Sequence, residues 1–300
     1  MERRIHFGMK EVFDVRTKKQ RYDHFRVGHG DGRGTYENGL APGFQEKVDQ
    51  FNQLIRKKVP IDLGNGKAEA MSRKDLKCRY DIHQRWTAGT KGKVFLNVSM
   101  GPTSWQEWKQ DYNRSPEQAE ALQELGLKQH QDRGFYLSQG LGAAVLTMTR
   151  EGDVVVGVRK SDSYDGAIHG AAGWMTFNRD VSKISPVKDA YRELQEELAI
   201  SPQEVSALNL IGLVAYPQTL EADFVFIAKT GKEKEYFTSG AWKEAVDAKE
   251  HRDLIVLDHP QQIERLLGEG KVVESDKKYE VLASTAYGLE QLARHWDGLR

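Results

Sequence analysis

The 300-residue sequence predicts an α/β protein in which helices pack on a mixed β-sheet. Apolar runs such as 141–149 and 208–216 are typical of buried strands, and amphipathic stretches such as 185–198 are typical of helices. The two kinds of segment are interspersed along the second part of the chain. The first part is more polar and dotted with glycine. We therefore predict an N-terminal α+β extension over residues 1–135 and the main sheet domain over 136–300.

Two helices are expected in the extension. The first covers about 44–58, where Phe44, Val48, Phe51 and Ile55 recur at helical spacing. The second begins at Ser115, because Ser115 and Gln118 form a capping-box pattern and Pro116 suits the first helical position. Gly126 is its expected end.

The main domain begins with a predicted hairpin, in which strands 141–149 and 154–158 flank a turn at Arg150–Asp153. A long loop and a helix near 185–198 follow. The remaining expected elements are strands at 208–216 and 222–229 around Pro217, a short strand at 254–257, and a final helix marked by Val281, Leu282, Ala286, Leu289, Leu292 and Trp296.

The composition excludes several classes of function. The 44 basic and 44 acidic side chains give a formal net charge of zero, so no general field attracts nucleic acid or an anionic membrane. Cys78 is the only cysteine, which rules out an intramolecular disulfide. No run approaches the roughly 20 apolar residues that cross a bilayer. We expect a cytoplasmic protein with a small-molecule partner, and the sequence does not specify its oligomeric state.

The helix near 185–198 carries the main chemical signal. Ser185 and Pro186 supply its cap and first residue, and Val187, Leu194 and Leu198 are expected on its buried side. Glu193, Glu196 and Glu197 stand at i, i+3 and i+4, so their carboxylates share one patch. Oxygen ligands of this kind suit Mg²⁺. By itself, such a run is more often the solvated face of a charged helix.

The run Arg192-Glu-Leu-Gln-Glu-Glu-Leu-Ala-Ile200 resembles the second half of the Nudix box, Arg-Glu-apolar-x-Glu-Glu-x-Gly-apolar, with Ala199 in place of the glycine. The resemblance implies a sheet sandwiched by helices and a diphosphatase that uses Mg²⁺, with Mn²⁺ as the alternative. It also implies metal ligands. These are Glu193, Glu196, Glu197 and a backbone carbonyl of Ala172 or Gly173, in a glycine-containing loop. Arg192 would orient a glutamate through a charge-assisted hydrogen bond.

The first half of the box departs from the family pattern. Its glycine and upstream glutamate fall, by strict counting, on Asn178 and Ile184, so the loop after Gly173 is longer than usual. Arg192 and all three glutamates are retained, which favours an active site. The departures, with Ala199, leave open a catalytically silent module that only binds a nucleotide.

A second resemblance concerns the substrate. The stretches 79–83, 94–105, 136–145 and 156–161 are similar to atypical Nudix enzymes that hydrolyse UDP-glucose and UDP-galactose. With the box, the likeness covers roughly 79–260. It implies cleavage of a UDP-sugar to UMP and a sugar 1-phosphate. The alternative substrates are ADP-ribose, a dinucleotide or a nucleoside triphosphate.

Further site residues lie outside the box. A Nudix enzyme often uses an additional acid as base or ligand, and the candidates are Glu250, which we prefer because it lies in a loop beside a strand end, and Asp223. Trp174, next to Gly173, is a candidate for stacking on the base, and Arg159 for contacting a phosphate. Each is also compatible with a purely structural role.

Other aromatic and histidine side chains are expected to be structural. Trp105 and Trp108 are interpreted as packing between the two parts of the chain. The nine histidines show no paired spacing typical of zinc, so we expect them to be structural or exposed.

Overall fold

The computed structural model describes residues 94–296, apart from 132, 135, 162, 177–183, 217–218, 273–276 and 295, together with six strand segments before residue 94. Those segments are 10–14, 24–29, 60–62, 68–70, 76–80 and 85–88. The helix expected at 44–58 and the position Asn178 lie outside the described residues.

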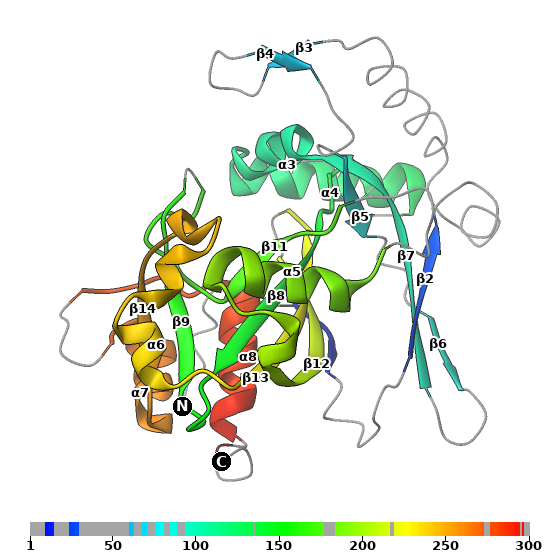
Figure 1. The fold of residues 1–300 in the computed structure, drawn as a ribbon. Helices are drawn as coiled ribbons and strands as arrows, with labels where there is room; N and C mark the ends of the chain where they lie inside the picture. Colours follow the sequence, from blue (N-terminus) through cyan, green and yellow to red (C-terminus); the bar gives the residue numbers. More distant parts are fainter. Residues whose placement is uncertain are drawn as a thin grey trace.

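An eight-stranded mixed sheet forms the main domain (Figure 1). Its strands follow the order β1-β12-β13-β8-β9-β10, with β11 also paired to β8 and β14 also paired to β9. The strands are β1 (Lys10–Asp14), β8 (Leu141–Met148), β9 (Val154–Arg159), β10 (Ile168–His169), β11 (Ala171–Trp174), β12 (Val205–Ala215), β13 (Ala222–Thr230) and β14 (His251–Leu257). The β13–β8 pair is parallel, and the other pairs in this sheet are antiparallel. The predicted strands are therefore confirmed, and β14 begins three residues earlier than expected.

The segment 168–174 bridges a split in this sheet. Strand β9 pairs with the end of β8 at Thr147 and Met148 only. Beyond that point β10 pairs with β9, and after Gly170 the chain crosses over so that β11 pairs with β8. A Cβ atom at Gly170 would overlap the carbonyl of Val145, so the crossover needs glycine. Ala172 and Gly173 were expected in a loop, and this is wrong because they complete the sheet.

Helices cover both faces of the sheet, as expected for the α/β architecture. On one face, α5 (Pro186–Leu198) packs Leu194 and Leu198 into a core that includes Leu141, Val145 and Phe224. On the other face, α8 (Ala283–Arg294) and α7 (Pro260–Glu269) pack on a second core, whose members include Leu146, Met148, Val225, Ile263 and Leu289. Successive β8 side chains alternate between the two cores, which explains the continuous apolar run.

Residues before 135 contribute to the same structure. Strand β1 pairs with β12, and Cys78 is buried in the α5-side core. A second sheet joins β2 (His24–His29), β5 (Leu76–Tyr80), β6 (Arg85–Ala88) and β7 (Val94–Ser104), while β3 (Pro60–Asp62) and β4 (Ala68–Ala70) pair with each other. The division of the chain at residue 135 stays a prediction, and residues from both sides of it share the main sheet.

Two helices follow β7: α3 (Trp105–Tyr112) and α4 (Pro116–His130). The predicted capping box at Ser115 and Gln118 is present. The helix does not end at Gly126, as expected, but continues to His130 and is capped by Gln131 in the left-handed conformation. Glycine weakens a helix by only about 1 kcal/mol, so it does not end one alone.

The smaller elements lie between β13 and β14. They are α6 (Lys234–Thr238) and the 3-10 turns η7 (Ala241–Glu244) and η8 (Ala248–Glu250), and a further turn, η6 (Pro202–Glu204), precedes β12. Within the described residues, the helices are too short or too polar to span a lipid bilayer.

Candidate metal and diphosphate site

The carboxylate-bearing helix α5 begins as predicted. Ser185 has an extended backbone and its side chain accepts a hydrogen bond from the Lys188 N–H at 3.3 Å. Leu194 and Leu198 are buried, whereas Val187, expected on the buried side, is exposed in the first turn. Ala190, Leu194 and Leu198 therefore hold the helix against the sheet, and the glutamates lie along the same part of it.

Glu193 and Glu197 point inward, against β11. Their residues are only 4% and 1% exposed, which is unusual for glutamate. The Ala172 N–H donates to Oε1 of Glu197 at 3.0 Å. A Cβ atom at Gly173 would overlap the Glu193 carboxylate, so glycine is needed there for Glu193 to reach the sheet. The helix and β11 thus bring Ala172, Gly173, Glu193 and Glu197 together.

Glu196 lies at the outer edge of this group, with its side chain 38% exposed. Arg192 Nη1 donates to Oε2 of Glu196 at 2.7 Å, and Arg192 Nη2 lies 2.5 Å from Oε1 of Glu193. The guanidinium also donates to Asp189 at 3.1 Å and to the Trp174 carbonyl at 3.5 Å. One arginine therefore links the helix carboxylates to the end of β11.

The electrostatics of the two inner glutamates favour a bound cation. Burial, and then the neighbouring Glu197, raise the pKa of Glu193 to about 9. Burial, and then the charge of Glu250, raise the pKa of Glu197 well above its ordinary value. Within the described residues, Oε1 of Glu193 is paired with Arg192, and Oε2 of Glu197 faces Nε2 of His251 at 2.7 Å. Two buried carboxyl groups beside one guanidinium need a proton or a second cation.

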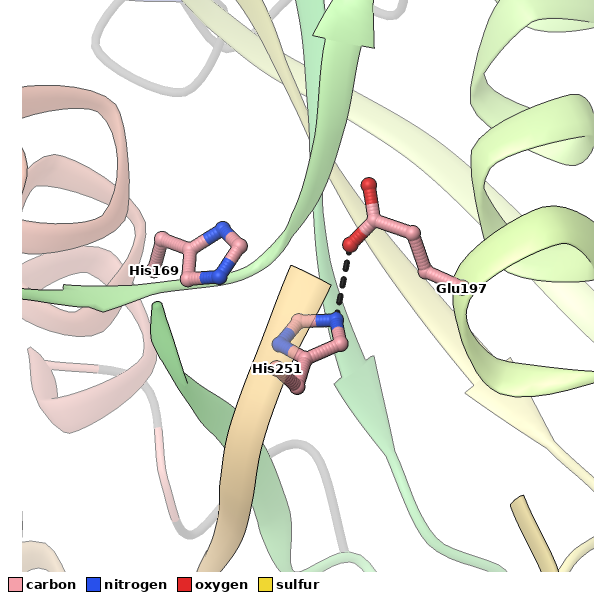
Figure 2. A group of neighbouring side chains, drawn as sticks. All are labelled: His169, Glu197 and His251. Atoms are coloured by element: carbon pink, nitrogen blue, oxygen red, sulfur yellow. Dashed lines mark ion pairs between the residues drawn. The ribbon is translucent and has the colours of Figure 1, made fainter. Parts of the chain in front are cut away.

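Two histidines that the sequence gave no reason to select lie beside Glu197. His169 ends β10 and His251 begins β14, and both are buried. Nε2 of His251 lies 2.7 Å from Oε2 of Glu197, and the two imidazoles stack with centroids 4.6 Å apart (Figure 2). Burial lowers the pKa of His169 and lowers that of His251 to about 4, so both are neutral near pH 7. The only available sequence signal was adjacency, of His169 to the glycine-rich segment and of His251 to Glu250.

Arg159 and Glu250 supply the charges around this group. Arg159 ends β9 and is held by Ser161 Oγ at 2.8 Å and the Ser163 carbonyl at 3.1 Å. Its positive charge acts to lower the pKa of Glu197, of Asp223 and of both histidines. Glu250 is half-buried, directly precedes β14 and acts on Glu197 and His251. Both charges therefore act on Glu197.

Asp223 belongs to a separate, neighbouring acidic group. It accepts a hydrogen bond from the Tyr216 hydroxyl at 3.2 Å, and burial raises its pKa to about 6. Glu221 accepts from the Trp108 indole and, at 3.4 Å, from the Tyr164 hydroxyl. Burial and then Asp223 raise the pKa of Glu221 to about 8. Glu221 is an acid that the sequence analysis did not select.

Trp174 lies at the edge of an aromatic group. Its ring meets those of Trp105 and Trp108 edge-on, each with centroids 5.4 Å apart. Trp108 is buried and stacks on Trp105 and Tyr112, whereas Trp105 is 38% exposed. The expectation that Trp105 and Trp108 pack the two parts of the chain together agrees with these contacts. Trp174 connects this aromatic group to the Arg192 end of the site.

Ala199 caps α5 in the left-handed conformation with φ of 54°. Glycine adopts this backbone without strain, while a Cβ atom costs about 1–2 kcal/mol. The backbone at Ala199 is therefore one that favours glycine, the residue that the resembled pattern has at this position.

Comparisons with known proteins give a likeness of fold only. No protein-family model and no curated protein matches the sequence. Among solved structures, the chain is similar to a Nudix hydrolase from M. smegmatis, RenU, at 15% identity and a TM-score of 0.35, over 54% of this chain and 88% of that one. It is also similar to the NUDIX domain of Shewanella oneidensis NrtR complexed with ADP ribose, at 12% identity and a TM-score of 0.35, over 53% and 88%. The MutT protein from Methanosarcina mazei Go1 matches at 17% identity and a TM-score of 0.32, over 52% and 94%. Likenesses this distant say nothing of activity, so the function has to be inferred from the side chains.

Proposed function

We propose that the chain is a divalent-metal-dependent Nudix hydrolase that cleaves the phosphoric anhydride bond of a nucleoside diphosphate linked to another group. The substrate we propose is a UDP-sugar, and the products are UMP and a sugar 1-phosphate. One observation carries the proposal. Glu193 and Glu197, from the box-like helix, are two carboxyl groups buried side by side against β11, and the Arg192 guanidinium pairs with Glu193 alone of the two.

The donor set fits a hard divalent cation. Carboxylate and carbonyl oxygens are the ligands that Mg²⁺ and Mn²⁺ prefer. Glu193, Glu197 and Glu196 would hold the ion, with a backbone carbonyl of Ala172 or Gly173. A bound ion of this kind supplies charge neutralisation on the diphosphate and lowers the pKa of a coordinated water.

The other residues position and polarise the reactants. Arg192 fixes Glu196 and Glu193 through its ion pairs and prevents the carboxylates from moving apart. Arg159, held by Ser161 and Ser163, is placed to pair with a phosphate oxygen. Glu250 is the proposed general base, because its charge acts on Glu197 and it remains partly accessible to water.

The proposed recognition of the base uses the aromatic group. Trp174 and the partly exposed Trp105 offer flat surfaces to a uracil ring, and Asp223 offers an acceptor nearby. Support for a UDP-sugar in particular comes from the sequence likeness over 79–161. ADP-ribose, a dinucleotide and a nucleoside triphosphate remain the alternative substrates.

A substrate panel tests the proposal. The protein is incubated with UDP-glucose, UDP-galactose, ADP-ribose, a diadenosine polyphosphate and nucleoside triphosphates, with Mg²⁺ or Mn²⁺, and products are separated by ion-exchange chromatography. We expect UMP from the UDP-sugars and a loss of about 100-fold or more in kcat for Glu193→Gln. The matched control is Glu124→Gln, an exposed position on α4, which should retain full activity.

Two results would contradict the proposal. Undiminished turnover by Glu193→Gln would remove the assigned metal site. Nucleotide binding measured by calorimetry, with no product from any member of the panel, would instead support the catalytically silent module.

A further inference from the structure

We propose that His169, Glu197 and His251 form a binding site for one divalent transition-metal ion, with Zn²⁺ as its preferred occupant. The three side chains come from three elements, β10, α5 and β14 (Figure 2). One ligand atom from each lies within 4.8 Å of the others. Ligand atoms on a tetrahedral zinc ion lie about 3.4 Å apart, so the widest separation has to shorten by up to about 1.4 Å, which small side-chain rotations supply.

The local backbone is built around the two imidazoles. Gly157 on β9 pairs with His169, and a Cβ atom at Gly157 would overlap the ring of His251. The β9–β14 register shifts between His251 and Asp253, and such an irregularity redirects the side chains next to it. Any larger residue at Gly157 would displace the histidine. The glycine thus makes space that a structural core would fill with an apolar side chain.

His169 lacks a regular hydrogen-bond partner within the described residues. Its residue is 1% exposed, and neither ring nitrogen makes a hydrogen bond of normal geometry there. The Gly170 backbone raises the pKa of His169, as a carbonyl acceptor does, and the Gly170 N–H donates to Thr285 Oγ1 at 3.0 Å. The backbone thus engages at most one nitrogen of the buried ring. The other nitrogen is left for a metal bond.

The ligand type distinguishes this site from the proposed magnesium site. Two imidazoles and one carboxylate favour zinc and similar transition metals, while Mg²⁺ prefers oxygen. Three protein ligands also leave a coordination position open. Glu197 belongs to both proposed sites. Its Oε1 accepts a hydrogen bond from the Ala172 N–H on β11, and its Oε2 faces His251. The neighbouring charges are Arg159, which opposes a cation, and Glu250, which favours one.

Metal binding tests the proposal without any assay of hydrolysis. The 300-residue chain is freed of metal by a chelator and titrated with Zn²⁺ by calorimetry, in a large excess of Mg²⁺. We expect one tight site, and a loss of affinity of at least about 100-fold in His169→Gln and in His251→Gln. The control is His259→Gln, an exposed residue just beyond the opposite end of β14. No zinc binding by the unaltered protein, or unchanged affinity in both cluster variants, would overturn the proposal.

Two further measurements keep the test decisive if the variants fold poorly. In the unaltered protein labelled with ¹⁵N-histidine, Zn²⁺ should shift the imidazole signals of two buried histidines, and shifts confined to exposed histidines would overturn the proposal. Glu193→Gln should lose hydrolysis yet retain zinc. Zinc binding without hydrolysis in the unaltered protein would reject the proposed function and leave this site standing.

Discussion

Nε2 of His251 lies 2.7 Å from Oε2 of Glu197, and both side chains are almost completely buried. The pair joins the last turn of α5 to the first residue of β14. It holds Glu197, the most buried glutamate of the candidate site, against the sheet and away from solvent. The site therefore depends on contacts between elements as well as on the helix.

The stability of the metal-free protein should depend on pH through Glu193. Its pKa is raised from 4.5 to about 9, so the folded chain keeps a proton that the unfolded chain releases. The stabilising contribution of the Glu193 proton is fully present below pH 4.5, the pKa in the unfolded chain. It is lost as the pH rises through about 9, the pKa in the folded chain, at up to about 1.4 kcal/mol per pH unit. Glu193→Gln removes this part of the pH dependence, while the raised pKa values of Glu197 and Glu221 keep theirs. Urea denaturation at a series of pH values in chelator measures it, and parallel curves for the two proteins would count against it.

Gly173→Ala should reduce both stability and activity. The added Cβ would overlap the Glu193 carboxylate and push it away from β11. We expect a loss of about 1–3 kcal/mol in unfolding free energy, as for an overpacked core, and a fall in kcat. Gly268→Ala is the matched control, since nothing lies within 4 Å of a Cβ there and α7 should gain up to about 1 kcal/mol. Equal stability of the two variants would refute the assigned contact.

Ala199→Gly should stabilise the protein by about 1 kcal/mol, because it relieves the left-handed strain at the end of α5. The same change in an ordinary helical position has the opposite sign. Ala121→Gly, on the exposed side of α4, should cost about 1 kcal/mol. Urea midpoints of the two variants decide the matter, and a loss of stability at both positions would disprove strain at Ala199.

Arg192→Lys should lower kcat about 10- to 100-fold with little change in folding stability. The guanidinium contacts Asp189, Glu193 and Glu196 together, whereas a lysine ammonium is a single point of charge. Arg265→Lys, in an exposed pair with Glu269 on α7, is the control and should be neutral. The measurement is steady-state kinetics on the substrate that the panel identifies. Full activity with lysine at position 192 would show that the arginine geometry is dispensable.

Local sequence features predicted most of the elements correctly, because they depend on neighbours along the chain. The cap at Ser185, the hairpin of β8 and β9 and the β12–β13 pair all follow from short-range patterns. The same holds for the spacing of Glu193, Glu196 and Glu197, since one helical turn decides which side chains share a face. Gly126 does not end α4, because one glycine weakens a helix by only about 1 kcal/mol, and Val187 lies exposed in the first turn of α5.

Helical spacing is enough to place three glutamates on one helix next to an arginine. Which of them are buried depends on long-range packing, and Glu193 and Glu197 face the sheet while Glu196 lies at the edge. The same packing also brings His169 and His251 to Glu197 from distant parts of the chain. The physical reason is that sheet register and the crossover at Gly170 are set by long-range pairing and core packing, which no local pattern encodes.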